Sequence, residues 1–174
     1  MPSPDVLRDL AVAGRSLERD EATRHAGAGA HDPTATPHRV LEELLGDLGL
    51  TEGSHLLDVG CGAGRVLATE AAAWSARYPN ARVVAGSALD LPLAGYTHVY
   101  LFNPFDTPVL EAFLDRLERE ASAPVTLVHM SDNGEWPAYL GRGGWTVLRE
   151  GSFELSGEDG DCPQHFTVRR FDPA

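Results

Sequence analysis

Three glycines at alternate positions follow an acidic residue in His55–Leu67, and this segment is the part of the chain best suited to binding a ligand. The apolar run before the glycines ends at Asp58, and the glycines are Gly60, Gly62 and Gly64. Glycine tolerates a positive φ angle and lets a ligand approach the backbone closely. The free N–H groups of the helix predicted to follow would then face that ligand. The segment therefore predicts a ligand-binding turn between a buried strand and a helix.

The glycine spacing distinguishes two classes of nucleotide-binding turn. A dinucleotide fingerprint has its third glycine one place later, where this chain has Arg65. The G-x-G-x-G spacing after an acid instead resembles motif I of the class I S-adenosylmethionine-dependent methyltransferases. The resemblance implies S-adenosylmethionine as the cofactor. It also implies that five residues of the turn bind it: Asp58, Gly60, Cys61, Gly62 and Gly64.

A second motif follows the uncharged run Thr97–Phe102. Asn103-Pro104-Phe105 resembles motif IV of the same family, whose Asn-Pro-aromatic variants lie beside the sulfonium. In members that act on planar nitrogen, this motif accepts hydrogen bonds from the target amine and an aromatic ring stacks on it. The resemblance therefore implies that Asn103, Pro104 and Phe105 are catalytic. The alternative is a plain strand-to-helix turn in which asparagine tolerates unusual backbone angles.

Two further segments resemble small bacterial members of this family. His31–Leu50 resembles the helix that leads into the fold. Gly86–Leu93 resembles the loop after the third core strand, which flanks the adenine, and this implies that Ser87 and Ala88 bind the cofactor. A serine that serves only the turn is the alternative for Ser87. The resemblance covers roughly Pro33–Phe171.

The composition sets limits on the function. A chain of 174 residues with 43% hydrophobic and 23% charged residues is typical of one globular domain. A formal net charge of −12 argues against a protein that grips nucleic acid over a broad face. Apolar runs stay short of the ~20 residues of a membrane span, and Met1–Asp20 does not read as a signal peptide, so a cytoplasmic location is expected. Seven histidines lie without metal-ligand spacing, so no metal is expected.

The elements that must position these motifs alternate between strand and helix. Uncharged runs predict three adjacent central strands, at Ser54–Val59, Thr97–Phe102 and Pro124–Met130. The spacing of apolar residues predicts helices at Pro4–Thr23, after the N-cap Thr36 with Pro37 as first helical residue, at Gly64–Arg77 and at Pro108–Ala121. Two final strands, Trp145–Leu155 and Gln164–Phe171, predict a hairpin.

This order predicts an α/β fold, a Rossmann-like doubly wound and mainly parallel sheet with a C-terminal antiparallel hairpin. Residues 1–35 are expected to form an N-terminal helix and loop, and residues 36–174 a methyltransferase-like α/β domain. The sheet is expected to be shortened relative to the full methyltransferase core, because the span from Ser54 to Phe171 is too short for six or seven strands with their helices.

The chain departs from the family pattern where the ribose should be bound. The family's second strand ends about 20 residues past the glycines in an acid that binds both ribose hydroxyls. The segment at that distance, Ala81–Ala85, is followed by Gly86-Ser87 and carries no acid at its end. Either it is the second strand without its acid, or it is the third strand and the second strand–helix unit is missing, which the length favours. Weak or absent cofactor binding by the isolated chain is expected in either case.

Three functions fit these observations in decreasing order. The first is an enzyme that transfers a methyl group from S-adenosylmethionine to a nitrogen of a small-molecule or protein acceptor. The second is a catalytically degenerate methyltransferase-like domain that acts as a binding or regulatory module. The third is an oxidoreductase that uses a nicotinamide cofactor, which Arg65 and the missing ribose acid both disfavour.

Overall fold

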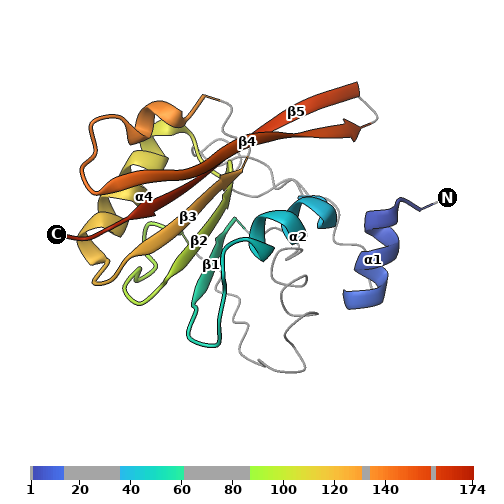
Figure 1. Ribbon diagram of the computed structural model, residues 1–174. Coiled ribbons are helices and arrows are strands. Elements are labelled where there is room, and N and C mark those ends of the chain that lie inside the picture. The colour runs from blue at the N-terminus through green and yellow to red at the C-terminus, as the bar shows by residue number, and fades with distance from the viewer. Residues whose placement is uncertain (1, 14–35, 61–86, 131–133, 158–159) are drawn as a thin grey trace.

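The computed structural model describes residues 2–13, 36–60, 87–130, 134–157 and 160–174 (Figure 1). Its helices are α1 (Pro4–Ala13), α2 (His38–Gly46), α4 (Thr107–Glu120) and the short 3-10 helix η1 (Trp136–Tyr139). Its strands are β1 (Leu56–Val59), β2 (His98–Phe102), β3 (Val125–Met130), β4 (Trp145–Gly157) and β5 (Gly160–Phe171). The predicted helix Gly64–Arg77 and the predicted strand Ala81–Ala85 lie outside the described residues, so the missing strand–helix unit stays a prediction.

The five strands form one sheet in the order β1-β2-β3-β5-β4. Strands β1, β2 and β3 are parallel, whereas β5 runs antiparallel to both β3 and β4. The predicted α/β sheet, the adjacency of its three parallel strands and its terminal hairpin are therefore confirmed, and the described sheet is mixed, with two parallel and two antiparallel pairings. Strand β1 was expected at a central position, but in the described part of the sheet it is the outermost strand on its side.

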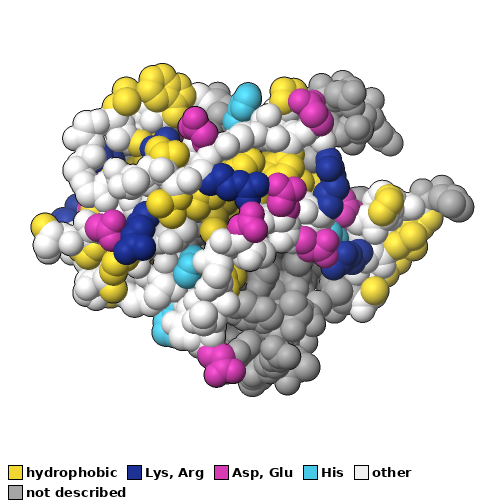
Figure 2. Space-filling view, in the orientation of Figure 1, with side chains coloured by type: hydrophobic (Ala, Val, Ile, Leu, Met, Phe, Trp, Pro, Cys, Tyr) yellow, Lys and Arg dark blue, Asp and Glu magenta, His cyan; other side chains and the backbone are white. Residues whose placement is uncertain are grey.

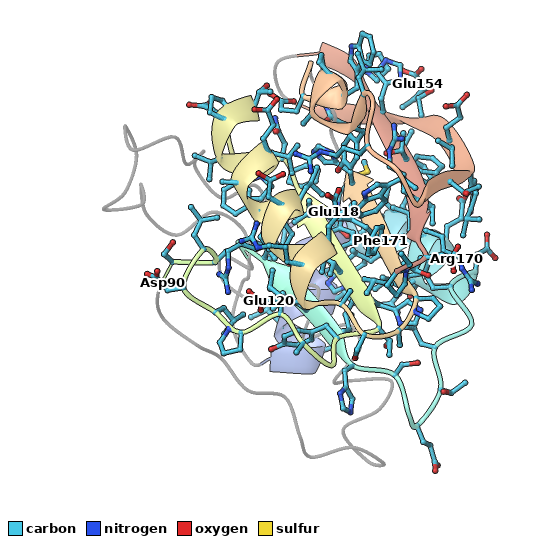
Figure 3. The ribbon with its side chains drawn as sticks, turned by 90° about the vertical axis from the view of Figure 1, so that its left-hand side faces the viewer. Asp90, Glu118, Glu120, Glu154, Arg170 and Phe171 are labelled. Carbon is cyan, nitrogen blue, oxygen red and sulfur yellow. The ribbon has the colours of Figure 1, made fainter. Side chains whose placement is uncertain are left out.

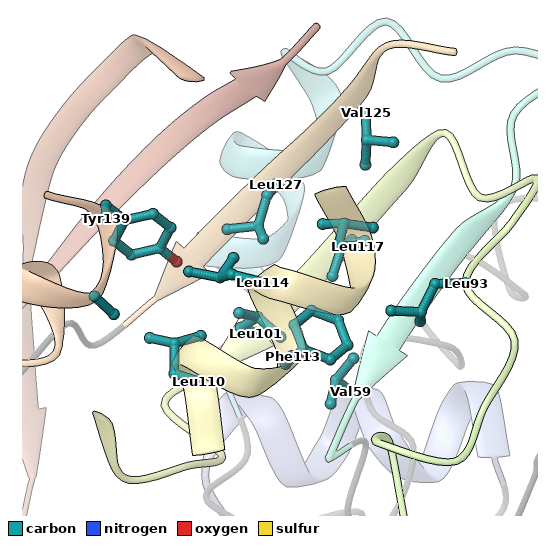
Figure 4. Packing of buried hydrophobic residues seen from close by; sticks show 12 residues of the cluster. Val59, Leu93, Leu101, Leu110, Phe113, Leu114, Leu117, Val125, Leu127 and Tyr139 are labelled. Carbon is teal, nitrogen blue, oxygen red and sulfur yellow. The ribbon is translucent and has the colours of Figure 1, made fainter. Parts of the chain in front are cut away.

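Helices α2 and α4 cover opposite faces of the sheet, because successive strand residues point to opposite sides. Leu101 and Leu127 pack with one face of α4, whose amphipathic sequence buries four residues against them, Leu110, Phe113, Leu114 and Leu117 (Figure 4). On the other face, Tyr100 and Val128 pack with the buried side of α2. Each fully buried leucine in these clusters contributes roughly 1.5–3 kcal/mol of hydrophobic free energy. The parallel strands therefore lie between two helical layers.

The start of α2 differs from the prediction that Thr36 caps the helix and Pro37 is its first residue. Pro37 itself occupies the N-cap position, and its side chain makes no capping hydrogen bond. The Thr36 hydroxyl instead lies 2.7 Å from the hydroxyl of Tyr100. The threonine therefore ties the chain to the sheet, because the buried tyrosine hydroxyl needs a hydrogen-bond partner.

Helix α1 docks on the start of α2 through polar contacts. The backbone N–H of His38 donates to the Asp5 carboxylate at 3.0 Å, and its Nε2 lies 2.8 Å from Asp9 Oδ1. Both members of the His38–Asp9 pair are buried. Arg8 forms an ion pair with Glu42 of α2. Helix α1, whose two leucines are about half exposed, therefore contacts α2 through hydrogen bonds and an ion pair.

The β4–β5 hairpin extends past the end of β3 (Figure 1). Met130, the last residue of β3, pairs with Phe166, while β5 reaches back to Gly160. The Phe166 ring stacks on that of Phe153 with their centroids 5.1 Å apart. The hairpin therefore projects beyond the end of β3.

Helix α2 also braces this hairpin through charges. Arg149 of β4 donates to Glu43 at 2.8 Å and to Asp47 at 2.6 Å. Figure 2 shows acidic and basic side chains side by side on this face of the molecule. Strand β4 carries a register irregularity between Val147 and Arg149.

None of the helices among the described residues combines the length and apolar character that crossing a membrane requires.

Candidate functional site

The two motifs predicted from the sequence meet where β1 and β2 end. Val59 at the end of β1 is paired with Leu101 near the end of β2, so the residues that follow each strand emerge together. Gly60 has a φ angle of +75°, and a Cβ atom added there would lie 2.9 Å from the Cβ of Pro104. Only glycine fits this backbone without a shift. The glycine turn and the Asn-Pro-Phe motif therefore touch at the carboxyl edge of the parallel strands, where open α/β sheets bind ligands.

Asp58 places a carboxylate on the α2 side of this edge. It is paired in the sheet with Tyr100, and its Oδ2 atom is buried without a hydrogen-bond partner among the described residues. Burial raises the pKa of Asp58 to about 7, well above its ordinary value. An unpaired buried carboxylate is unfavourable for folding, and such groups are concentrated at functional sites. The arrangement suits a ligand that brings a hydrogen-bond donor or a positive charge to Asp58.

Sequence reasoning missed Tyr100, which lies beside Asp58. Its side chain is fully buried, and its hydroxyl is held by Thr36. Burial raises the pKa of Tyr100, and the neighbouring Asp58 raises it further, so the tyrosine remains neutral. The available signal was the tyrosine hydroxyl within the uncharged run Thr97–Phe102, because a buried tyrosine hydroxyl usually has a hydrogen-bond partner.

Asn103 has a φ angle of +39°, which makes it the one non-glycine residue with a positive φ among those the structure describes. Asparagine adopts this left-handed region more readily than most residues, but the conformation still costs of order 1–3 kcal/mol. Backbone strain of this kind is concentrated at functional sites. The Phe105 ring lies 6.0 Å from Phe113 and packs toward the α4 cluster. Its stacking on an acceptor stays a prediction.

The remaining predicted site residues are less closely grouped. The Ser87 hydroxyl accepts a hydrogen bond from the backbone N–H of Leu89 at 3.1 Å, so it serves the local turn. Ala88 is partly buried against the α4 cluster. Cys61, Gly62 and Gly64 lie outside the described residues.

A second buried carboxylate oxygen follows β3 and was also missed. The Oε2 atom of Glu135, the residue before η1, is buried and has no hydrogen-bond partner among the described residues. The only sequence signal was an acid shortly after the third of the uncharged strands. Within the described part of the chain, buried carboxylate oxygens without a partner thus lie near the ends of β1 and β3.

The sequence matches no protein-family model and no curated protein. Solved structures, however, share its fold. The N-methyltransferase NodS from Bradyrhizobium japonicum WM9, in complex with S-adenosyl-L-homocysteine, superposes with a TM-score of 0.55 at 13% identity, covering 79% of this chain and 86% of NodS. The magnesium protoporphyrin IX methyltransferase ChlM from Synechocystis PCC 6803, with bound S-adenosylmethionine, gives a TM-score of 0.51 at 15% identity over 77% of each chain.

A third similar structure is the precorrin-6y C5,15-methyltransferase from Geobacter metallireducens GS-15, with a TM-score of 0.50, 13% identity and coverage of 87% of this chain and 98% of that one. The chain has the class I methyltransferase fold. Within this methyltransferase fold, Gly60 and Pro104 meet at the carboxyl edge of the sheet, with Asp58 on the α2 side.

Proposed function

We propose that this protein is a class I methyltransferase that transfers a methyl group from S-adenosylmethionine to a nitrogen atom of a small-molecule or protein acceptor. The observation that carries the proposal is the contact between Gly60 and Pro104. It joins two motifs, 44 positions apart in number, that resemble the same family and would otherwise be independent short matches. The shared fold supports the same conclusion.

The described residues fit the cofactor in two respects. Gly60 has the positive φ angle and close packing of a tight glycine turn, and Asp58 offers a buried carboxylate oxygen without a partner among the described residues. Asp58 would accept a hydrogen bond from the cofactor's ammonium group. The cofactor would also lie close to the backbone that follows Gly60. The other residues proposed to hold the cofactor are Cys61, Gly62, Gly64, Ser87 and Ala88. When bound, the cofactor supplies a methyl group that a nitrogen lone pair can attack.

The work of the protein's own groups is mainly alignment. The amide oxygen of Asn103 would accept an N–H of the acceptor and turn its lone pair toward the methyl group. Pro104 fixes the turn, and Phe105 would limit the position of the acceptor. Holding two reactants in line supplies much of the barrier reduction in such a reaction.

The second candidate is a methyltransferase-like domain without catalysis, and one sequence observation favours it. Ala81–Ala85 has no acid at its end to bind the ribose hydroxyls. Losing two charge-assisted hydrogen bonds weakens binding by roughly 3 kcal/mol or more, over a hundredfold. Either Glu70 or Asp90 is proposed to replace this acid in an active enzyme.

Calorimetric titration with S-adenosylhomocysteine separates the two candidates. Saturable binding supports the methyltransferase, and no heat at millimolar ligand favours the non-catalytic domain. Transfer from S-adenosylmethionine labelled in its methyl group is then measured on matched amines and alcohols. Label in the amines alone supports a nitrogen acceptor, and label in the alcohols contradicts it.

A further inference from the structure

The segment Ser87–Leu93 takes its shape from two side chains of α4. The guanidinium of Arg116 donates to the carbonyl oxygens of Ala88 at 3.4 Å, Leu91 at 2.9 Å and Leu89. The Glu120 carboxylate accepts the backbone N–H of Leu93 at 2.7 Å. Four backbone groups of one irregular segment are therefore paired with a single pair of charged residues.

Arg116 and Glu120 also hold each other. Glu120 Oε1 accepts from Arg116 Nε at 3.0 Å and from its terminal nitrogen at 2.6 Å. The planar guanidinium has five donors in a fixed fork, so this geometry fixes where the carbonyls must lie. The hydrogen bonds to Leu93 and Arg116 lower the pKa of Glu120, which therefore remains charged.

The order of these contacts shows that the Ala88 end of the segment lies nearer the start of α4 than the Leu93 end does. Leu93 contacts Glu120 in the last turn of α4, whereas Ala88 and Leu91 contact Arg116, one turn nearer the start of the helix. Helix side chains lean toward the N-terminus, so the guanidinium is displaced further in that direction. The start of α4 follows the Asn-Pro-Phe motif at the carboxyl edge. Figure 3 shows Asp90 of this segment beside α4, and Glu120 on the helix.

We propose that Arg116 and Glu120 are positioning residues that hold Ser87 and Ala88 in place for the adenosine half of the cofactor. This inference rests on the proposed function. Neither charged residue needs to touch the ligand. A segment already held in its bound shape loses less conformational entropy when the ligand arrives, so affinity is higher than for a free segment.

The test compares variants of this pair with Arg142→Ala. Arg142 is a matched control, because it also pairs with α4 carboxylates, Asp115 at 2.7 Å and Glu118 at 3.0 Å, and it is similarly buried. Calorimetry with S-adenosylhomocysteine and with 5′-methylthioadenosine measures affinity for ligands that share the adenosine half. Hydrogen exchange of the amides between residues 87 and 95 measures the segment itself without ligand.

We expect Arg116→Ala to lower the binding affinity for both ligands about tenfold or more, because hydrogen bonds to a charged group are lost. Amide hydrogen exchange in the segment should also become faster. Glu120→Gln should retain more affinity than Glu120→Ala, because its single amide oxygen can still accept the Leu93 N–H, although its NH2 group cannot accept from Arg116. Arg142→Ala should change neither affinity nor exchange in this segment. The glutamine–alanine comparison decides the matter if Arg116→Ala does not fold.

Three results overturn the inference. Unchanged affinity in Arg116→Ala or Glu120→Ala would leave the proposed function standing and reject the positioning role. Equal losses in Arg116→Ala and Arg142→Ala would assign the effect to general stability and likewise reject it. No binding of either ligand by the wild-type protein would reject the proposed function together with the inference.

Discussion

Asn in place of Asp58 should make the protein more stable at pH 8 and change its stability much less at low pH. The folded-state pKa of Asp58 is about 7, against 3.8 for an ordinary aspartate. As the pH rises from 4 to 7, the unfolded chain therefore releases this proton before the folded protein does. The free energy of unfolding falls through this window, and the loss is complete above pH 7. Asparagine has nearly the same shape without the charge and should remove that loss.

The size of the effect follows from the same two values. At 1.36 kcal/mol per pH unit, Asp58→Asn should add up to about 4 kcal/mol at pH 8 and about 2 kcal/mol at pH 5. These are upper bounds, because water reaches part of the side chain. Urea unfolding followed by circular dichroism at a series of pH values measures the difference directly.

Asp90→Asn is the control, because Asp90 is exposed and its replacement removes the same charge from a protein of net charge −12. The difference between the two variants isolates the contribution of burial. Equal gains for Asp58→Asn and Asp90→Asn at pH 8, or a loss of stability in Asp58→Asn, would refute the reasoning. Asp58→Asn should also weaken S-adenosylhomocysteine binding, so this variant should be more stable but bind the ligand less tightly.

Three other substitutions test the packing around the site. Gly60→Ala should weaken ligand binding and lower the free energy of unfolding, because its Cβ would meet Pro104. Gly46→Ala, where the added Cβ meets no atom within 4 Å, should lower neither. Equal results for the two variants in calorimetry and urea unfolding would contradict the close approach of Gly60 to Pro104. Tyr100→Phe should lower the free energy of unfolding by about 1 kcal/mol, and a double-mutant cycle with Thr36→Val should show coupling, absent if the 2.7 Å contact contributes nothing. Phe113→Ala should cost about 3–5 kcal/mol in urea unfolding, and a loss below about 1 kcal/mol would show that the α4 cluster is loosely packed.

The strands could be predicted from the sequence because their composition is local. The uncharged run Thr97–Phe102 gives β2 with one residue fewer, and Pro124–Met130 gives β3 likewise. Gly60 could be assigned to a tight turn with a positive φ angle for the same reason. The contact of Thr36 with Tyr100 joins residues 64 positions apart, and no local pattern encodes it.

The properties of the site were harder to predict than its members. Asp58 was identified from its place before the glycines, but its raised pKa depends on how α2 and the sheet enclose it. Ser87 stays a predicted cofactor contact, and the sequence did not show that its hydroxyl also accepts the Leu89 N–H in the turn. The hydrogen bonds from Arg116 to the segment Ser87–Leu93 depend on a helix that begins 20 positions after Ser87. Arginine is so common on helix surfaces that its presence in the sequence does not predict these contacts.

The irregular pairing in β4 bears on whether copies of the chain associate. Strand β4 is the outer strand of the described sheet on its side, and Val147 and Leu148 are 44% and 55% exposed there. A long flat outer strand with apolar side chains is a template for another chain. The register shift between Val147 and Arg149 bends and twists the strand at this apolar stretch, so a straight neighbour cannot continue its hydrogen bonds. Deleting Leu148 would straighten the outer edge of β4, and we expect the protein to self-associate as a result.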